Sequence, residues 1–284
     1  MTILITGATG NVGRPLVTLL HQAGAQVRAV SRNPGAEFPP GVDTVASVRD
    51  GLDGVSAVFL NSRALGSDLA WAVRAAKDAS ADKLVALSAI NADDDFARQP
   101  SRFRGDRNKE VEQYAIDSGL TWVSLRPSLF VTNFIGMWAG QLQAGDVVAG
   151  PYASAASAPI VESDIAAVAA HALLTDELDH RKIDLTGPQS FTNAELVQVV
   201  AQVLGRNLHY HQIPIEQVQE RFTAIGFPAE FGTAYAALLA QTLDTPARVT
   251  DEIERILRRP ARTFTDWVRE HRAVFARTSE HSHV

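Results

Sequence analysis

Three glycines near the start of the chain are spaced as in a phosphate-binding loop. Gly7, Gly10 and Gly13 follow the apolar run 3–6 and precede a segment with helical periodicity. Gly7 permits a tight turn, Gly10 lets the main chain approach a pyrophosphate, and Gly13 lets the helix pack closely on the strand. The free amides and the dipole of the helix N-terminus favour an anion there. We therefore expect a dinucleotide to contact Gly7, Thr9, Gly10, Asn11, Val12 and Gly13.

An arginine after the second apolar run indicates which dinucleotide the loop would take. Ser31, Arg32 and Asn33 follow the apolar run 27–30. In this kind of fold, Asp or Glu about twenty residues after the loop binds the adenosine ribose, whereas arginine suits a 2′-phosphate. Arg32 therefore favours NADP(H) over NAD(H), and the alternative is a solvated loop cation without a ligand. Arg28, inside the same run, is less well placed.

Alternating strands and helices must position these residues. Short apolar runs alternate with helical periods over the first half of the chain, which predicts βαβ units and a parallel sheet. Strands are expected at 3–6, 27–30, 44–46, 57–60, 84–87 and 122–125. The link 46–57 is short and holds two glycines, so we expect its crossover helix to be stunted or missing. The expected fold class is a Rossmann-type, doubly wound α/β sheet.

The pattern changes after Arg126 and Pro127, where glycine, proline and small residues punctuate the chain. We place the transition near residue 135. This gives a Rossmann domain over 1–135 and a smaller, mostly helical α/β region over 136–284 that caps the substrate. Helices are expected there at 163–174, 193–204, 231–243, 251–257 and 265–275, and strands at 182–185 and 208–212. The strand at 182–185 would return to the main sheet.

Composition narrows the classes of function. The formal net charge is −6 without a long block of like charge, which disfavours nucleic-acid binding. The chain has no cysteine, which removes disulfides, thiolate nucleophiles and cysteine-ligated metals, and we expect no metal site. No apolar stretch has the length needed to span a membrane, and no leader precedes the first run. We therefore expect a soluble, cytoplasmic protein.

Further segments, taken together, are much more specific than the glycine loop alone. They resemble the NmrA-like family of atypical short-chain dehydrogenases/reductases, which includes NADPH-dependent quinone reductases and redox-sensing regulators. The resemblance covers most of the chain. The segments that carry it are 7–13 (GATGNVG), 31–34 (SRNP), 125–134 (LRPSLFVTNF), 164–169 (DIAAVA), 185–188 (LTGP), 204–206 (LGR) and 262–264 (RTF).

The resemblance implies further residues at the cofactor and the substrate. The serine that ends the fifth strand would lie beside the nicotinamide, and the segment after the fourth strand would run under the cofactor. The turn after the sixth strand would border both nicotinamide and substrate. The cofactor contacts implied in this way are Asn61, Ser62, Arg63, Ser88 and Pro127. Aromatic residues of the C-terminal half could line an apolar pocket, with ordinary core packing as the alternative. The expected pocket residues are Phe130, Asn133, Phe134 and Trp138.

The usual proton donor of short-chain dehydrogenases is missing from this chain. In those enzymes a Tyr-x-x-x-Lys pair lowers the pKa of the tyrosine, so that a phenol can protonate the developing alkoxide. Here the residues at that spacing are Tyr114 and Ser118, Tyr152 and Ala156, Tyr210 and Pro214, and Tyr235 and Leu239. The resemblance puts the lysine position on Asn108 and the tyrosine position on Arg104. Lys109 is one step along the helix and would face another direction.

Hydride transfer to some acceptors remains possible without that pair. The transfer is the chemistry of the cofactor, and the protein chiefly orients the nicotinamide against an acceptor. A quinone gives a hydroquinone anion that solvent, Ser88 or Asn108 could stabilise, so these two are the candidate catalytic residues. We expect an NADPH-dependent reductase of a quinone or polycyclic aromatic compound, for example one derived from a polyketide. It could supply a hydroquinone to a partner oxygenase.

The missing pair also suits a protein that only senses its cofactor. In an NADP(H)-sensing regulator of NmrA type, the state of the bound cofactor would determine whether a regulatory partner protein binds. Turnover, or a partner that binds in one cofactor state alone, distinguishes this alternative from a reductase. A reductase and a sensor could each be an oligomer. A nucleotide-sugar epimerase or dehydratase requires the missing pair and is disfavoured for that reason.

Overall fold

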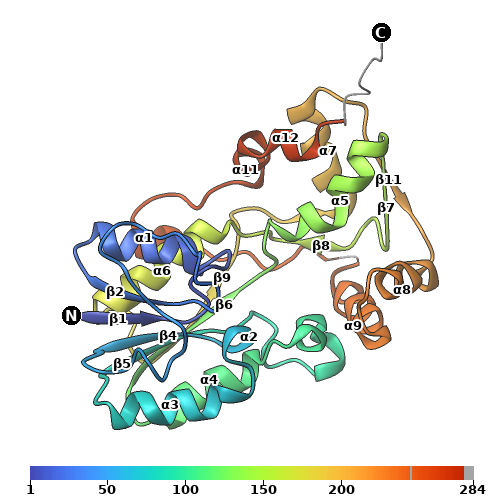
Figure 1. Ribbon diagram of the computed structural model, residues 1–284. Helices are drawn as coiled ribbons and strands as arrows, with labels where there is room; N and C mark the ends of the chain where they lie inside the picture. The colour runs from blue at the N-terminus through green and yellow to red at the C-terminus, as the bar shows by residue number, and fades with distance from the viewer. Residues whose placement is uncertain (244, 278–284) are drawn as a thin grey trace.

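Seven parallel strands form the central sheet of the computed structural model, which describes residues 1–243 and 245–277 (Figure 1). They are β1 (Thr2–Ile5), β2 (Gln26–Val30), β3 (Asp43–Val45), β4 (Ala57–Asn61), β5 (Lys83–Leu87), β6 (Thr121–Pro127) and β9 (Arg181–Leu185). Their order is β3-β2-β1-β4-β5-β6-β9. Because the order reverses between β1 and β4, the sheet is doubly wound, as the sequence predicted. Ligands of such sheets bind beyond the carboxyl ends of the strands at this reversal.

Alternate side chains of each central strand enter two different cores. The helices that cover the sheet are α1 (Gly13–Gln22), α3 (Leu69–Asp78), α4 (Asn108–Asp117) and α6 (Glu162–Leu174). Ile3 and Ile5 are buried with α1 and α6, whereas Leu4 is buried with α3 and α4. Figure 1 shows one pair of helices on each face of the sheet. Side chains of a strand alternate between faces, so strands covered on both sides are apolar throughout.

The link from β3 to β4 contains no helix, as its glycines predicted. Nη1 of Arg28 donates to the carbonyl oxygens of Gly51 at 2.5 Å and Asp53 at 2.8 Å. A Cβ at Gly51 would lie 2.8 Å from Cδ1 of Leu4, so close packing here requires glycine. Arg28 is therefore occupied in holding the link. Short helices follow β4 and β5 at α2 (Ser62–Leu65), η1 (Gly66–Asp68), η2 (Phe96–Arg98) and η3 (Pro100–Arg104).

The C-terminal half forms a third core. Phe134 and Trp138 pack there with Phe264 and Trp267. Besides α6, the described helices of this half are α5 (Asn133–Ala144), α7 (Asn193–Leu204), α8 (Ile215–Ala224), α9 (Ala229–Leu239), η4 (Ala240–Thr242), α10 (Glu252–Leu257), α11 (Phe264–Glu270) and α12 (Arg272–Phe275). Two small sheets pair β7 (Val147–Gly150) with β11 (His209–Gln212) and β8 (Ala156–Ser157) with β10 (Phe191–Thr192). None of the described helices is long and apolar enough to cross a membrane.

After the chain leaves the main sheet at the end of β6, it returns to that sheet at β9. β9 pairs with β6 as an edge strand, and α6 packs on α1. Ile253 and Ile256 of α10 also enter the core of α1 and α6. The division at residue 135 thus stays our prediction of where the chain first leaves the sheet. The end of the expected second region, 278–284, lies outside the described residues.

Two helices were not predicted, and one was predicted too long. α5 contains Gly136 and Gly140, which weaken the sequence signal because glycine costs about 1 kcal/mol in a helix. α8 buries only Val218 and is mostly polar, so its low apolar content hides it in the sequence. The helix expected at 265–275 is interrupted at His271, which separates α11 from α12.

Candidate functional site

The glycine loop between β1 and α1 has a geometry that requires glycine. Gly7 has a φ of +67°, and a Cβ there would lie 3.0 Å from Nδ2 of Asn61. A Cβ at Gly13 would collide with the carbonyl oxygen of Gly7 and lie 2.9 Å from Cα of Ala8. The amide of Gly10 donates to the carbonyl oxygen of Gly7 at 2.9 Å, which closes the turn. The loop thus folds tightly against the end of β4.

Consecutive amides at the start of α1 are free to bind a ligand. Within the described residues, the main-chain N–H groups of Asn11, Val12 and Gly13 donate no hydrogen bond. Thr9, Gly10 and Asn11 are exposed, so an anion can reach this end of the helix. The close packing at Gly13 and the free amides together fit the pyrophosphate of a dinucleotide.

Side chains join β1 to β4 where the strand order reverses. Oγ1 of Thr6 donates to the carbonyl oxygen of Phe59 at 2.8 Å and accepts the amide of Asn61 at 2.8 Å. Oδ1 of Asn61 accepts from the amide of Ala64 at 3.2 Å, which caps α2. The structure thus brings Asn61 beside Gly7, as expected for neighbours under one cofactor. Thr6 was missed as a positioning residue, although it directly precedes the glycine motif.

Ser62 and Arg63, which were also predicted to contact the cofactor, bind the segment before α4. Oγ of the buried Ser62 accepts from the amide of Arg107 at 2.9 Å. The guanidinium of Arg63 pairs with the carboxylate of Asp106, and Nε donates to Oδ1 at 3.1 Å. Both contacts hold residues 106–107 against the carboxyl end of β4.

Arg32 lies on a fixed turn but has a free side chain. Oγ of the buried Ser31 donates to the carbonyl oxygen of Asn33 at 3.0 Å and accepts its amide at 3.2 Å. Arg32 is exposed, and within residues 1–243 and 245–277 its guanidinium makes no ion pair or hydrogen bond. In contrast to Arg28, it keeps all its donors for a ligand or for solvent.

The two candidate catalytic residues are in contact with each other. Oγ of Ser88, at the end of β5, donates to the main-chain carbonyl oxygen of Asn108 at 2.9 Å. Nδ2 of Asn108 donates to Oγ of Ser101 at 3.2 Å, and both candidates are buried. The proton of Ser88 is thus used inside the protein. Asn108 retains a second amide hydrogen and is the better placed donor of the two.

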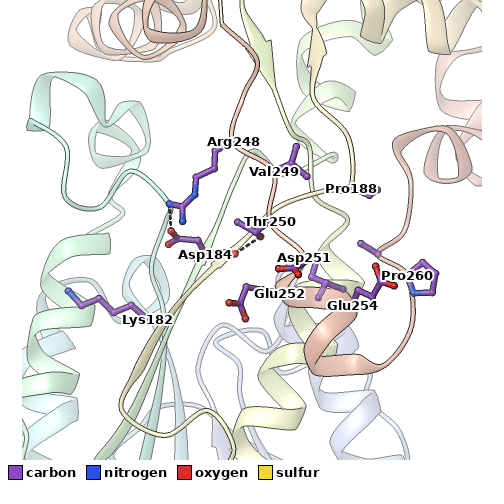
Figure 2. Close-up of a pocket in the computed structure, with 12 residues that line it drawn as sticks. Lys182, Asp184, Pro188, Arg248, Val249, Thr250, Asp251, Glu252, Glu254 and Pro260 are labelled. Carbon is purple, nitrogen blue, oxygen red and sulfur yellow. Dashed lines mark hydrogen bonds and ion pairs between the residues drawn. The ribbon is translucent and has the colours of Figure 1, made fainter.

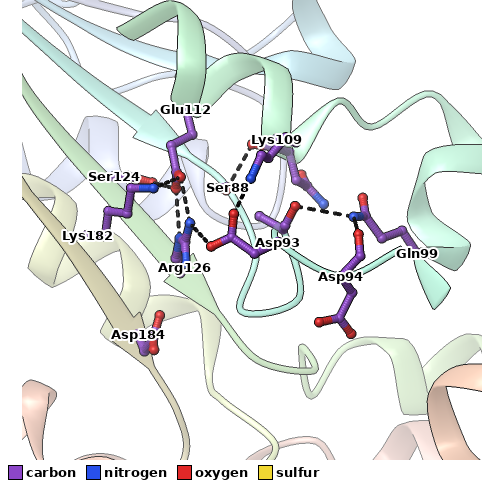
Figure 3. A network of polar contacts seen from close by, with 12 residues as sticks. Ser88, Asp93, Asp94, Gln99, Lys109, Glu112, Ser124, Arg126, Lys182 and Asp184 are labelled. Carbon is purple, nitrogen blue, oxygen red and sulfur yellow. Dashed lines mark hydrogen bonds and ion pairs between the residues drawn. The ribbon is translucent and has the colours of Figure 1, made fainter. Parts of the chain in front are cut away.

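A charged network beneath these residues joins four parts of the fold (Figure 3). Glu112 of α4, which is 1% exposed, binds Arg126 through two hydrogen bonds of 2.6 and 2.7 Å. It also accepts from Oγ of Ser124 at 2.6 Å and pairs with Lys182 of β9 at 2.7 Å. Although burial opposes it, the hydrogen bonds from Arg126, Lys182 and Ser124 keep the pKa of Glu112 below its ordinary value.

Asp93 extends this network into the loop after β5. It pairs with Arg126 at 2.7 Å and with Lys109. These hydrogen bonds lower the pKa of Asp93 to about 2. Lys109 is therefore turned toward Asp93, and it does not take over the lysine role from Asn108. The same loop is held by Gln99, whose Nε2 donates to the carbonyl oxygen of Asp94 at 2.8 Å.

A second chain of contacts leads from the cofactor loop to the C-terminal half. Nδ2 of Asn11 donates to Oγ1 of Thr132 at 2.9 Å. Oγ1 and the amide of Thr132 both donate to the buried carboxylate of Glu162, the latter at 3.1 Å. Burial raises the pKa of Glu162. The turn 127–133 is thereby fixed next to the loop, and neither Thr132 nor Glu162 was predicted to be a site residue.

The structure divides the expected pocket residues into two groups. Phe134 is 1% and Trp138 5% exposed, and their rings, tilted by 38°, lie with centroids 4.4 Å apart inside the C-terminal core. Their assignment to the pocket stays a prediction, and in the structure both side chains pack in this core. Phe130 is partly buried beside Ile160, and Asn133 is exposed at the start of α5. Phe130 and Asn133 stay predictions for the pocket.

An aromatic cluster on α8 and α9 faces the loop that follows β5. Its members are Phe222, Phe227, Phe231 and Tyr235, with ring centroids 4.4 to 6.3 Å apart. α9 packs against η2 and η3. Burial raises the pKa of Tyr235 to about 12, and its hydroxyl contacts Sδ of Met137. Tyr235 is therefore a weak proton donor.

An open polar depression lies elsewhere, at the edge strand β9 (Figure 2). Arg248 pairs there with Asp184, and Oγ1 of Thr250 donates to the carbonyl oxygen of Asp184 at 2.8 Å. None of the predicted cofactor or substrate residues lines it. Among the described residues, no three His, Asp or Glu side chains are grouped to hold a metal.

Comparison with solved structures shows the same fold. The chain superposes on an NADPH-dependent quinone oxidoreductase of Escherichia coli, complexed with NADPH, with a TM-score of 0.81 and 19% identity. That match covers 95% of this chain and 99% of the other. A triphenylmethane reductase of Citrobacter sp. complexed with NADP(H) gives a TM-score of 0.77 at 18% identity, with the same shares covered.

Sequence comparison places the chain in a family. It is 32% identical over 285 residues to the (4-alkanoyl-5-oxo-2,5-dihydrofuran-3-yl)methyl phosphate reductase of Streptomyces griseus subsp. griseus, covering 96% of this chain and 99% of that protein. It is 29% identical to the NAD(P)H azoreductase of Xenophilus azovorans, with the same shares covered. The model of the NmrA-like family matches residues 1–256. The chain therefore belongs to the NmrA-like family, as its motifs predicted.

Proposed function

We propose that this protein is an NADPH-dependent reductase that transfers hydride to a quinone or to another electron-poor conjugated acceptor. The observation that carries the proposal is the set of free amides at Asn11, Val12 and Gly13, at a helix end where Thr9, Gly10 and Asn11 are exposed. Arg32, which has no ion pair among the described residues, lies at the end of the neighbouring strand. The amides suit a pyrophosphate and the arginine suits a 2′-phosphate. NADP(H) is thus the proposed cofactor, in preference to NAD(H).

In this mechanism the residues of the chain bind the cofactor and orient it against the acceptor. NADPH supplies the hydride; with one proton from solvent, the quinone becomes a hydroquinone. The loop amides hold the pyrophosphate, and Asn61, fixed by Thr6 and Ala64, supports the cofactor at the end of β4. Ser88 keeps the start of α4 in place through the carbonyl oxygen of Asn108. The free amide hydrogen of Asn108 stabilises the oxygen that gains negative charge.

The names of the relatives support an electron-poor acceptor. One relative is named as the reductase of a 5-oxo-2,5-dihydrofuran that carries an alkanoyl group, and another is named as an azoreductase. Such acceptors and quinones all delocalise the charge that hydride transfer brings, so a strong acid is not needed. A polyketide origin of the substrate, a partner oxygenase and a cytoplasmic location stay predictions from the sequence.

A cofactor-sensing role is the second candidate, and one contact favours it. The hydroxyl of Ser88 donates to a main-chain carbonyl oxygen, so it supplies no proton to a substrate in this conformation. A sensor would bind NADP(H) through the same loop. The contacts from Asn11 to Thr132 and from Thr132 to Glu162 would then couple cofactor binding to the turn 127–133. Its regulatory partner would bind in one cofactor state alone.

The test is NADPH oxidation, followed by absorbance, with a panel of benzo-, naphtho- and anthraquinones. The proposal expects saturable turnover, and Arg32→Glu is expected to raise the KM for NADPH at least tenfold. Arg74→Glu is the matched control, because Arg74 is also exposed but lies on α3, away from the glycine loop. NADPH binding without oxidation by any acceptor would contradict the reductase and favour the sensor.

A further inference from the structure

The helix η3 and the turn that joins it to α4 contain three arginines, of which two have polar partners. Arg102 pairs with Glu110 at 2.7 Å and stacks over the ring of Phe96. Arg107 donates to the carbonyl oxygens of Arg102 at 2.9 Å and Asp106 at 2.7 Å. Arg104 is exposed, and within the described parts of the chain its guanidinium makes no ion pair and no hydrogen bond. Its donors are available to a ligand.

Arg104 lies close to the residues that frame the proposed reaction. The segment runs from Ser101, which accepts from Asn108, to Asp106, which pairs with Arg63. It therefore connects the ends of β4 and β5, where the cofactor residues are expected. From the other side, the ring of Phe227 lies 4.8 Å from the guanidinium of Arg104. Arg104 thus contacts the aromatic cluster through Phe227, and the helix η3 that carries it packs against α9.

A second arginine, Arg63, lies near Arg104. Burial and the charge of Arg63 lower the pKa of Arg104, and the nearby Asp106 offsets this only in part. Asp106 is itself engaged with Arg63. A bound anion would relieve the repulsion between the two arginines, and a guanidinium matches the geometry of an oxyanion.

We propose that Arg104, assisted by Arg63, binds an oxyanion on the substrate while the aromatic cluster contacts its conjugated rings. The inference rests on the proposed reductase function and names its substrate class: an aromatic or conjugated acceptor that carries a phosphate, sulfonate or carboxylate. The resemblance to short-chain dehydrogenases puts Arg104 at the position of their catalytic tyrosine. In this chain that position serves charge recognition.

The competing explanation is mechanical. Arg104 would then only hold α8 and α9 against the sheet through a cation–π contact with the ring of Phe227. In that case, loss of the guanidinium and loss of the ring would have the same consequence. Replacing each partner separately therefore distinguishes the two explanations.

The experiment compares 1,4-naphthoquinone with 1,4-naphthoquinone-2-sulfonate as acceptors. The sulfonate also changes the reduction potential of the ring, so the measured quantity is the ratio of kcat/KM for the two acceptors in each variant. We expect Arg104→Gln to lower this ratio, sulfonate over parent, at least tenfold, and Arg104→Lys to lower it less. Phe227→Leu and the control Arg74→Gln should change it less than threefold. Because the chain has no cysteine, arylation of a thiol does not complicate the assay.

Binding provides a second readout that does not depend on turnover. Calorimetric titration of naphthoquinone-2-sulfonate into protein saturated with NADP⁺ should show at least tenfold weaker binding to Arg104→Gln. If wild-type protein turns over neither acceptor but the titration shows this loss, the reductase function fails and the oxyanion site stands. Equal effects of Arg104→Gln on both acceptors, or equal effects of Arg104→Gln and Phe227→Leu on the ratio, would overturn the proposal.

Discussion

Two groups of charged side chains in this molecule are used in opposite ways. Around Glu112, the carboxylate is buried and bound by Arg126, Lys182 and Ser124 at 2.6 to 2.7 Å. Arg32 and Arg104 are exposed, and neither has an ion pair among the described residues. A charge taken out of water requires a partner from the protein, whereas an exposed cation can keep its charge for a ligand. The paired group holds α4, β6 and β9 together, and the unpaired group marks where we expect anions.

The largest expected effect comes from breaking the paired group. Glu112→Gln leaves Arg126 and Lys182 without their buried carboxylate, which should lower the free energy of unfolding by about 3–5 kcal/mol. Urea unfolding at neutral pH measures it. Arg248→Gln, which removes one side of the exposed pair with Asp184, should change stability by less than about 1 kcal/mol. If the two variants were equally stable, the claim that the buried carboxylate of Glu112 matters more for stability than an exposed ion pair would be wrong.

The next largest effect is expected at the cofactor loop. Gly13→Ala forces a Cβ against the carbonyl carbon of Gly7 at 2.8 Å, so the main chain must shift. We expect a loss of about 1–3 kcal/mol in stability and a clear loss of NADPH affinity, measured by unfolding and by fluorescence titration. Gly136→Ala is the control, because nothing lies within 4 Å of an added Cβ there. NADPH binding to Gly13→Ala at wild-type strength would refute the loop assignment.

The pH dependence of stability should sharpen the same comparison. The pKa of Glu112 is lowered in the folded protein, so its contribution is complete above the unfolded value near 4.5 and is lost as pH falls through the folded value. The difference in stability between wild type and Glu112→Gln should therefore narrow below about pH 4.5. The lowered pKa of Asp93, about 2, makes both proteins lose stability as pH falls. The raised pKa of Glu162 has the opposite effect, because protonation of this carboxylate at low pH favours the folded state. Urea unfolding across this range measures the difference, and a constant difference would contradict the role of Glu112.

The fold could be predicted because local patterns determine it. The apolar runs from 3–6 to 122–125 were expected from the sequence, since strands covered on both faces must be apolar throughout. The missing helix between β3 and β4 followed from the glycines in that link. Helix α5 was not predicted, because its two glycines hide a face whose large residues Phe134 and Trp138 fill the C-terminal core.

The site was only partly predictable, because its contacts join residues far apart in the chain. The motif identified the glycine loop and Arg32, whose positions depend on local turns. The bond from Ser88 to Asn108 spans 20 residues, and the bond from Asn11 to Thr132 spans 121. No local pattern indicates that Glu162 accepts from Thr132, or that Phe227 lies over Arg104. Such contacts follow from how the C-terminal half packs against the sheet.

The central claim, that the unpaired arginines Arg32 and Arg104 are anion sites, is tested most directly at Arg32. The measurement is the equilibrium dissociation constant of NADPH and of NADH, by titration, for wild type and Arg32→Glu. We expect the wild type to bind NADPH at least tenfold more tightly than NADH, and Arg32→Glu to lose that preference while keeping its affinity for NADH within a few-fold. An unchanged preference in the variant would show that Arg32 is a solvated cation and would contradict the claim.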